Sequence, residues 1–243
     1  MKRINSEKSS KKSERHTSRV KKSSVESDSM TMTIKDLHDV KPFSKAKFAV
    51  VRAAAQAVRE DGPRAATLKN VAGRAGITEP AIFRHFDGVD GLFEGLFHVV
   101  EGAWRHFAEA FDPAAAPLAR LGKALKYRIE LLSADLDLAY LALYPRQVFG
   151  GYPELRARID SIWEQDRVLV EACLTEAIAS GALRGEVAME SLRALTVGAC
   201  QSLAIRWVES TGSFDLVKTF DTLWEDFLKL ATPASRKRAA TKA

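Results

Sequence analysis

The chain has 243 residues, of which 46% are hydrophobic, and this is enough for one or two domains with a sizeable core. No run of 18 or more apolar residues occurs, and no apolar segment follows the basic N-terminus, so neither a membrane span nor a secretory signal is expected. The two cysteines, Cys173 and Cys200, lie in apolar helical patterns. They are expected to be reduced core thiols of a cytoplasmic protein, with a redox-sensing pair as the alternative.

The formal net charge of +6 is unevenly distributed along the chain. Residues 1–41 carry 11 Lys or Arg against 6 Asp or Glu, and residues 44–86 carry 8 against 3. Residues 87–232 reverse the balance, with 14 against 22. A short basic segment joined to a long acidic one indicates a polyanion-binding module attached to a body of another purpose. Solvated charge without function would explain the tails, but it explains residues 44–86 less naturally.

The two ends of the chain have the composition of disordered tails. Residues 1–41 are rich in Ser and Lys and contain hardly any large apolar residue before Met30. Residues 233–243, "PASRKRAATKA", are basic and equally poor in apolar side chains. Such segments cannot bury enough surface to offset the entropy of ordering, so both are predicted to be disordered.

Between the tails, apolar residues recur with helical periodicity and no alternating strand pattern persists, which predicts an all-α fold of about nine helices. Capping residues, glycines and prolines bound the helices. The predicted helices span about 44–61, 68–75, 79–85, 89–111, 118–134, 136 to a break near Pro145, 153–181, 188–210 and 214–231.

The second and third predicted helices are joined only by Gly76-Ile77-Thr78. An eight-residue helix, a glycine-containing turn and a short second helix have the spacing of a helix-turn-helix, here at about 67–86. A short helix with small residues at its front can enter the DNA major groove, while its N-terminal amides and cationic side chains contact phosphates. An ordinary surface helical hairpin is the alternative.

Three stretches carry a resemblance to a known family: "VVRAAAQAVREDG" (50–62), "TLKNVAGRAGIT" (67–78) and "EPAIFRHFDGVDGLF" (79–93). They resemble the TetR-type (TetR/AcrR) bacterial repressors. The likeness is specific over about 44–104 and architectural beyond. It implies a helix-turn-helix DNA-binding domain at 44–104 and a ligand-binding and dimerisation domain at 105–232. It also implies a homodimer that binds a palindromic operator in double-stranded DNA and responds to a small-molecule inducer.

The resemblance implies which side chains contact DNA. The positions that match the family's DNA-binding residues are Thr67, Lys69, Thr78, Glu79, Pro80, Ala81, Phe83, Arg84 and His85. Phe83 replaces a usual tyrosine and Val89 a common lysine, so two phosphate contacts of the family are expected to be absent. Lys69, Arg84, His85 and the basic N-terminal tail would compensate. Glu79 either accepts a hydrogen bond from cytosine or only favours the helix dipole.

In the body, aromatic side chains gather in the segments that line the inducer cavity of the resembled family. The predicted ligand-binding residues are Trp104, Phe107, Phe111, Tyr127, Tyr140, Tyr144, Phe149 and Trp163. An apolar cavity with a few polar anchors is the usual form of a small-molecule site, although an apolar helical stripe more often forms core. Arg105, His106 and Arg128 are candidates to neutralise an acidic ligand, with surface exposure as the alternative.

The last two predicted helices carry wide apolar stripes that would form a four-helix interface across a two-fold axis. The predicted dimer-interface residues are Leu192, Leu195, Leu203, Phe220, Leu223, Trp224 and Phe227.

Enzyme chemistry is not indicated. Glu94, His98 and Glu101 share a helical face that could hold a metal, but exposed charge is the favoured interpretation. No Walker loop, nucleotide fingerprint or nucleophile constellation is present, so no cofactor, no metal and no enzymatic activity are expected. The predicted function is a ligand-responsive transcriptional repressor. The alternative is a DNA-bound structural or cell-cycle factor of the same fold whose body binds a protein partner.

Overall fold

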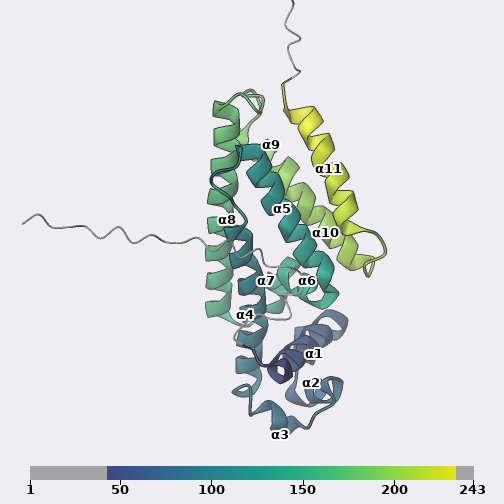
Figure 1. Ribbon diagram of the computed structural model, residues 1–243. Helices are drawn as coiled ribbons and strands as arrows, with labels where there is room; N and C mark the ends of the chain where they lie inside the picture. The colour runs from purple at the N-terminus through teal and green to yellow at the C-terminus, as the bar shows by residue number, and fades with distance from the viewer. Residues whose placement is uncertain (1–42, 234–243) are drawn as a thin grey trace, which may run out of the picture. The chain divides into compact units, whose positions relative to one another are not determined.

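The structure is a computed structural model and describes residues 43–233. Within this range every regular element is helical, as the sequence predicted (Figure 1). The elements in chain order are α1 (Lys45–Asp61), the 3-10 turn η2 (Pro63–Ala65), α2 (Leu68–Ala75), α3 (Glu79–Ile82), α4 (Gly88–Glu109), α5 (Pro117–Ala134), α6 (Leu136–Leu143), α7 (Pro145–Val148), α8 (Pro153–Ala179), α9 (Met189–Arg193), the π-helical turn η3 (Ala194–Gly198), α10 (Ala199–Glu209) and α11 (Leu216–Ala231). Apart from Pro233, the predicted tails lie outside the described residues. No helix within residues 43–233 is long and apolar enough to cross a bilayer.

The first helix forms where its capping residues predict. The Ser44 hydroxyl accepts a hydrogen bond from the Lys47 amide at 3.2 Å, which satisfies one of the unpaired donors of the first turn. Gly62, at φ 86°, ends the helix in a conformation that favours glycine. Between these caps, Val51 and Val58 belong to an apolar face that is fully buried. This face allows α1 to pack against α2 and α4.

The helix-turn-helix is formed by α2 and α3, which follow α1. The Thr67 hydroxyl accepts from the Asn70 amide at 3.3 Å, and Gly76 ends α2 in the left-handed region at φ 66°. The predicted helix 79–85 is shorter in the structure, because α3 ends at Ile82. The His85 amide donates to the Ile82 carbonyl at 2.8 Å, three residues back, so the chain tightens into a turn. This turn brings Phe86 into the core, where 5% of the residue remains exposed.

The long helix α4 connects this three-helix head to the rest of the described chain (Figure 1). It contacts α1 in the head and α5, α6 and α8 beyond it. One cluster of buried side chains joins α1–α4 to α7 and the start of α8. A second cluster joins the end of α4 to α5, α8, α10 and α11. The same helix therefore contributes to both cores, and the predicted boundary between domains 44–104 and 105–232 stays a prediction.

Two helices of the body are interrupted. The predicted break near Pro145 is confirmed, because α6 ends at Leu143 and α7 begins at the proline. The single helix predicted at 188–210 instead contains the π-helical turn η3. Within it the hydroxyl of buried Thr196 donates to the Leu192 carbonyl at 2.7 Å. A hydroxyl that takes a helix carbonyl competes with the regular backbone bond, which favours such a local change of pitch.

Candidate DNA-reading surface and ligand cavity

The outward side of α2, α3 and the turn after them carries the predicted DNA-binding residues. Ile82 is fully buried, so the residues around it on α3 face away from the core. Thr67, Lys69, Thr78, Glu79, Pro80, Phe83 and Arg84 are exposed, and Ala81 and His85 are partly buried. Phe83 is 58% exposed, and Ile77 in the turn before α3 is 38% exposed. The nine predicted residues are thus all exposed or partly exposed, and their roles toward DNA stay predictions.

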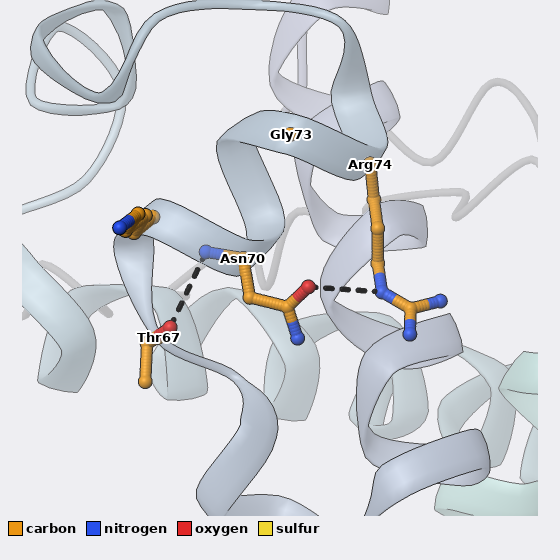
Figure 2. A pocket seen from close by; sticks show the side chains of 5 residues that line it. Thr67, Asn70, Gly73 and Arg74 are labelled. Atoms are coloured by element: carbon orange, nitrogen blue, oxygen red, sulfur yellow. Dashed lines mark hydrogen bonds between the residues drawn. The ribbon is translucent and has the colours of Figure 1, made fainter.

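A surface hollow of about 560 Å³ lies beside α2 and is lined by Thr67, Lys69, Asn70, Gly73 and Arg74. In Figure 2 the Arg74 side chain reaches the Asn70 carboxamide oxygen, at 3.3 Å. Arg74 also pairs with Glu60 and Asp61 of α1, each at 2.6 Å. The hydrogen bond from Arg74 holds the pKa of the Glu60 carboxyl below its usual value. Arg74 therefore fastens α2 to α1, whereas Lys69 of the same hollow forms no ion pair with any residue that the structure describes.

The basic charge of residues 44–86 is partly neutralised within the chain. Arg52 pairs with Asp135 at 2.9 Å, and Arg59 pairs with Asp137. Both carboxylates lie at the start of α6, so these pairs join the head to the body. Within residues 43–233, Lys69 and Arg84 take part in no salt bridge. Lys45, Lys47 and Arg64 also take part in no salt bridge within the described residues, so only part of the uncompensated charge lies on the helix-turn-helix, where a polyanion would meet it.

A cavity of about 420 Å³ lies in the body, between α4, α5, α6, α8 and the η3–α10 segment. Three of the predicted ligand-binding residues line it: Trp104, Phe107 and Trp163. Its size falls within the range of small-molecule pockets, roughly 300–1,000 Å³. The lining is mainly apolar with a few charged side chains, which suits an amphipathic ligand.

The other five predicted ligand-binding residues lie outside this lining. Phe111 packs edge-on against Phe107 with ring centroids 5.0 Å apart. Tyr140 packs on Tyr144, and the Tyr144 hydroxyl donates to Glu209 at 3.3 Å. Phe149 is fully buried against Phe93 and Phe97 in the first cluster, and Tyr127 is partly buried on α5. Helical periodicity identifies a buried face, but it does not show which part of that buried space is left unfilled.

Sequence reasoning missed most of the small residues that open the cavity, such as Ala103, Ala142, Ala194 and Gly198. A search for aromatic residues overlooks them, although small side chains facing one another are what leaves a void. A period-based search for alanine and glycine on the inner faces of α4 and α6 would have found the first two.

Of the three cations proposed to neutralise a ligand, only Arg128 lines the cavity. Arg105 has a side chain that is 65% exposed, and His106 bonds to Glu109 at 2.8 Å. Arg128 pairs with Asp166 and lies 3.6 Å from the centre of the Phe107 ring. Burial raises the pKa of the Asp166 carboxyl, and Arg128 opposes that rise.

Both cysteines are buried, and neither forms a disulfide bond within the described residues. Cys200 also lines the cavity, and burial raises the pKa of its thiol to about 12. At neutral pH this thiol is therefore protonated and a poor nucleophile.

The acidic face of α4 that was considered for a metal binds an arginine instead. Arg158 of α8 pairs with Glu94 at 3.2 Å and with Glu101 at 3.0 Å. Among the residues that the structure describes, no group of three or more His, Cys, Asp or Glu side chains has the arrangement of a metal site.

Comparison with protein families assigns both parts of the chain. Residues 50–96 match the model described as "Bacterial regulatory proteins, tetR family". Residues 101–229 match the model described as "YsiA-like protein, C-terminal region". The chain belongs to the tetR family of bacterial regulatory proteins. It is a DNA-binding transcriptional regulator, and α2 and α3 lie within the residues 50–96 that match the tetR model.

Individual tetR-family relatives agree with this assignment. The fatty acid metabolism regulator protein of Bacillus subtilis (strain 168) is 24% identical over 178 residues, which cover 72% of this chain and 90% of the relative. Among solved structures, the fatty acid degradation regulator FadR of Bacillus halodurans has a TM-score of 0.61 at 18% identity, covering 77% of this chain and 97% of that one. FadR of Bacillus subtilis in complex with stearoyl-CoA has a TM-score of 0.58 at 20% identity, covering 74% of this chain and 96% of that one. KstR2, a ketosteroid transcriptional regulator of Mycobacterium tuberculosis, has a TM-score of 0.63 at 18% identity, covering 79% of this chain and 97% of that one. These structural likenesses show the fold.

For a tetR-family protein the dimer interface is the second surface of interest, and the predicted interface residues differ in how exposed they are in a single chain. Leu192, Leu203, Phe220 and Phe227 are buried within their own chain, with at most 6% exposed. Leu223 and Trp224 are partly buried and pack against the same core cluster. Leu195 alone of the seven is exposed, at 51%. The strongest apolar stripe of an amphipathic helix faces the core of its own chain, so it does not mark the surface left for a second copy.

Proposed function

We propose that the protein is a cytoplasmic, homodimeric repressor that binds a palindromic operator through α2 and α3 and leaves it when a small molecule fills the cavity. The observation that supports this most is the position of α6. Near its end, Ala142 and Leu143 line the cavity. At its start, Asp135 and Asp137 pair with arginines of α1 in the head. A ligand that displaces α6 would therefore also act on the helix that supports the DNA-reading surface.

We propose a fatty acyl chain as the ligand, either as the free acid or as its coenzyme A thioester. The fatty acid metabolism regulator protein of Bacillus subtilis and the two FadR proteins support this class, and FadR of Bacillus subtilis was solved in complex with stearoyl-CoA. The cavity supports it independently, because its lining combines apolar side chains with Arg128, whose side chain is mostly buried. Linear acyl chains need such an apolar channel with one polar end.

A body that binds a protein partner instead of a small molecule is the alternative. A closed and fully packed body would favour that function. The cavity of about 420 Å³ favours the small-molecule response.

The proposed dimer forms through the outer faces of η3–α10 and α11. Leu195 of η3 and Leu230 of α11 are 51% and 73% exposed. Exposed leucines on two neighbouring helices of the body are suited to pairing with their symmetry mates.

Operator release tests the function. A duplex selected from random DNA by repeated binding to the full-length protein serves as the operator, and fluorescence anisotropy measures the affinity. Palmitoyl-CoA should weaken operator binding, whereas coenzyme A without the acyl chain should not. Arg84→Ala should weaken binding by about 1–3 kcal/mol if Arg84 contacts a base, with relaxed preference at one position. Undiminished operator binding at saturating, bound palmitoyl-CoA would contradict release by this ligand.

A further inference from the structure

We propose that Arg128 is the polar anchor of the cavity: its guanidinium holds the acyl oxygen of the bound ligand, in partial exchange for its bond to Asp166. This inference rests on the proposed function, because it identifies how the acyl ligand of that function is held. It assigns the polar end of the ligand to the interior of the body, between α5 and α8.

Three arginines line the cavity, and they differ in the number of carboxylates that pair with each of them. Arg167 bonds to two carboxylates, those of Glu164 and Glu171. Arg193 lies 3.1 Å from Glu190 and 3.3 Å from Glu171. Arg128 pairs with the single carboxylate of Asp166. Of the three, Arg128 has the most hydrogen-bonding capacity to offer a ligand.

One donor of Arg128 is without a partner. Its Nε is buried and has no hydrogen-bond acceptor among the described residues. A buried donor without an acceptor is costly, and a donor that belongs to a charged group is costlier still. A ligand oxygen placed within reach would remove that cost. The cavity beside Arg128 is the space from which such an oxygen can approach.

The surroundings of Arg128 strengthen any hydrogen bond that it makes. Its side chain is 19% exposed, and its guanidinium lies 3.6 Å from the centre of the Phe107 ring. Phe107 is 1% exposed and lines the same cavity. Charge-assisted hydrogen bonds in apolar surroundings are stronger than those in water. The acyl chain would lie along the apolar lining while its oxygen meets the guanidinium.

Asp166 competes with the proposed ligand for the guanidinium of Arg128. Its side chain is 15% exposed, and its carboxylate is the counter-ion of Arg128 in the cavity. The carboxylate of a free fatty acid competes with Asp166 for the same cation. Removing the negative charge of Asp166 should therefore tighten the binding of a carboxylate ligand, whereas removing Arg128 should weaken it.

Binding of palmitate and of palmitoyl-CoA to the full-length protein tests the anchor without DNA. Trp104 and Trp163 line the cavity, so quenching of tryptophan fluorescence reports occupancy. Both ligands are used below their micellar concentrations, and together they separate the free acid from the thioester as the source of the oxygen. The variants are Asp166→Asn and the double variant Arg128→Met with Asp166→Leu, which removes both charges and leaves no carboxylate buried alone. Arg156→Met is the matched control, because it is the same substitution at an exposed arginine of α8 that does not line the cavity.

The double variant should bind whichever ligand the wild type binds about tenfold more weakly or worse. Asp166→Asn should bind palmitate more tightly, and Arg156→Met should stay within about threefold of the wild type for palmitate. Wild-type affinity in a folded double variant would overturn the anchor and leave the acyl ligand of the proposed function intact. Failure of the wild type to bind either ligand would overturn both. If the double variant does not fold, equal or weaker palmitate binding by Asp166→Asn overturns the anchor.

Discussion

Phe83 is one of two departures from the family's pattern on the proposed DNA-reading surface. It is 58% exposed in the turn after α3, beside Arg84, and it stands where the resembled family usually has a tyrosine. An exposed phenyl ring can contact a sugar or a base methyl group, but it cannot donate to a phosphate.

Phe83→Tyr should therefore tighten DNA binding. One additional hydrogen bond is worth about 1 kcal/mol, or roughly a fivefold change in affinity. Because phosphate contacts carry no sequence information, operator and random duplexes should gain alike. Anisotropy titrations of both duplexes measure this, with Phe83→Leu as the control that adds no hydroxyl. A gain confined to the operator, or no gain, would show that position 83 does not face a phosphate.

At the scale of residues, the sequence predicted which side chains are exposed better than it predicted which side chains pair with one another. Helical periodicity alone predicts that Ile82 is buried and that Arg84 is exposed, as the structure has them. Arg74 carries the same charge as Arg84, yet it is held by Glu60 and Asp61 on another helix. Such a pairing depends on how α1 crosses α2, and no local pattern contains that crossing. The pair of Arg128 with Asp166 escaped prediction for the same reason, since it joins α5 to α8.

The contact between α5 and α11 shows how one small residue sets the distance between two helices. A methyl group built on Gly122 would lie 2.6 Å from Nε1 of Trp224. Trp224 is stacked on Phe227 at 5.1 Å, and Lys126 pairs with Asp221 at 2.7 Å along the same contact. The indole therefore lies directly on the α5 backbone, because position 122 has no side chain.

Gly122→Ala should destabilise the fold by about 1–3 kcal/mol, since overpacking forces the helices apart or the indole off its rotamer. In a chain of this size that lowers Tm by roughly 2–4 °C for each kcal/mol. Gly91→Ala in α4 is the matched control, because its methyl group would meet other atoms only at 3.5 Å or more. The smaller ring of Trp224→Phe should recover part of the stability lost at position 122. An unchanged Tm for Gly122→Ala would show that α11 moves away from α5 without cost.

At the scale of elements, ends governed by capping were predictable and ends governed by packing were not. Thr67 and Gly76 bound α2 as predicted, because their effects are local. The early end of α3 and the π-helical turn η3 depend on the burial of Phe86 and on the hydroxyl of Thr196. Neither is visible until the helices are packed.

For the whole molecule, the exposed Leu195 makes the proposed dimer testable. Leu195→Glu would place a charge in the interface, where an unpaired carboxylate loses its hydration. The protein should then sediment as a monomer or as a concentration-dependent mixture. Its helix content should be unchanged, because the side chain is 51% exposed in a single chain. Ala157→Glu, at an exposed position of α8, adds the same charge as a control. An unaltered dimer would place the interface elsewhere.

The last prediction concerns the ion pair that links α6, which lines the cavity, to α1 of the head. Arg59 of α1 pairs with Asp137 of α6, and both side chains are mostly buried. Asp135 is unsuitable for a test because it also caps α6, accepting from the Asp137 amide at 3.0 Å. Asp137→Asn removes the charge of the pair and keeps the size of the side chain. Operator-free protein should bind palmitoyl-CoA as before, and ligand-free protein should still bind the operator.

The variant should reduce the coupling between palmitoyl-CoA binding and operator binding. Coupling free energies between such sites are typically about 1–3 kcal/mol, or 5–150-fold in affinity, and they are reciprocal. With the link between α6 and α1 weakened, saturating palmitoyl-CoA should lower operator affinity several-fold less than in the wild type. The same reduction should appear in the acyl-CoA affinity measured with and without operator, because the thermodynamic cycle must close. Asp160→Asn is the control, since Asp160 lies 3.6 Å from Arg146 in an exposed pair. Wild-type coupling in Asp137→Asn would mean that the ligand reaches the head by another path, for which α4 is the next element to test because it lines the cavity and packs on α1.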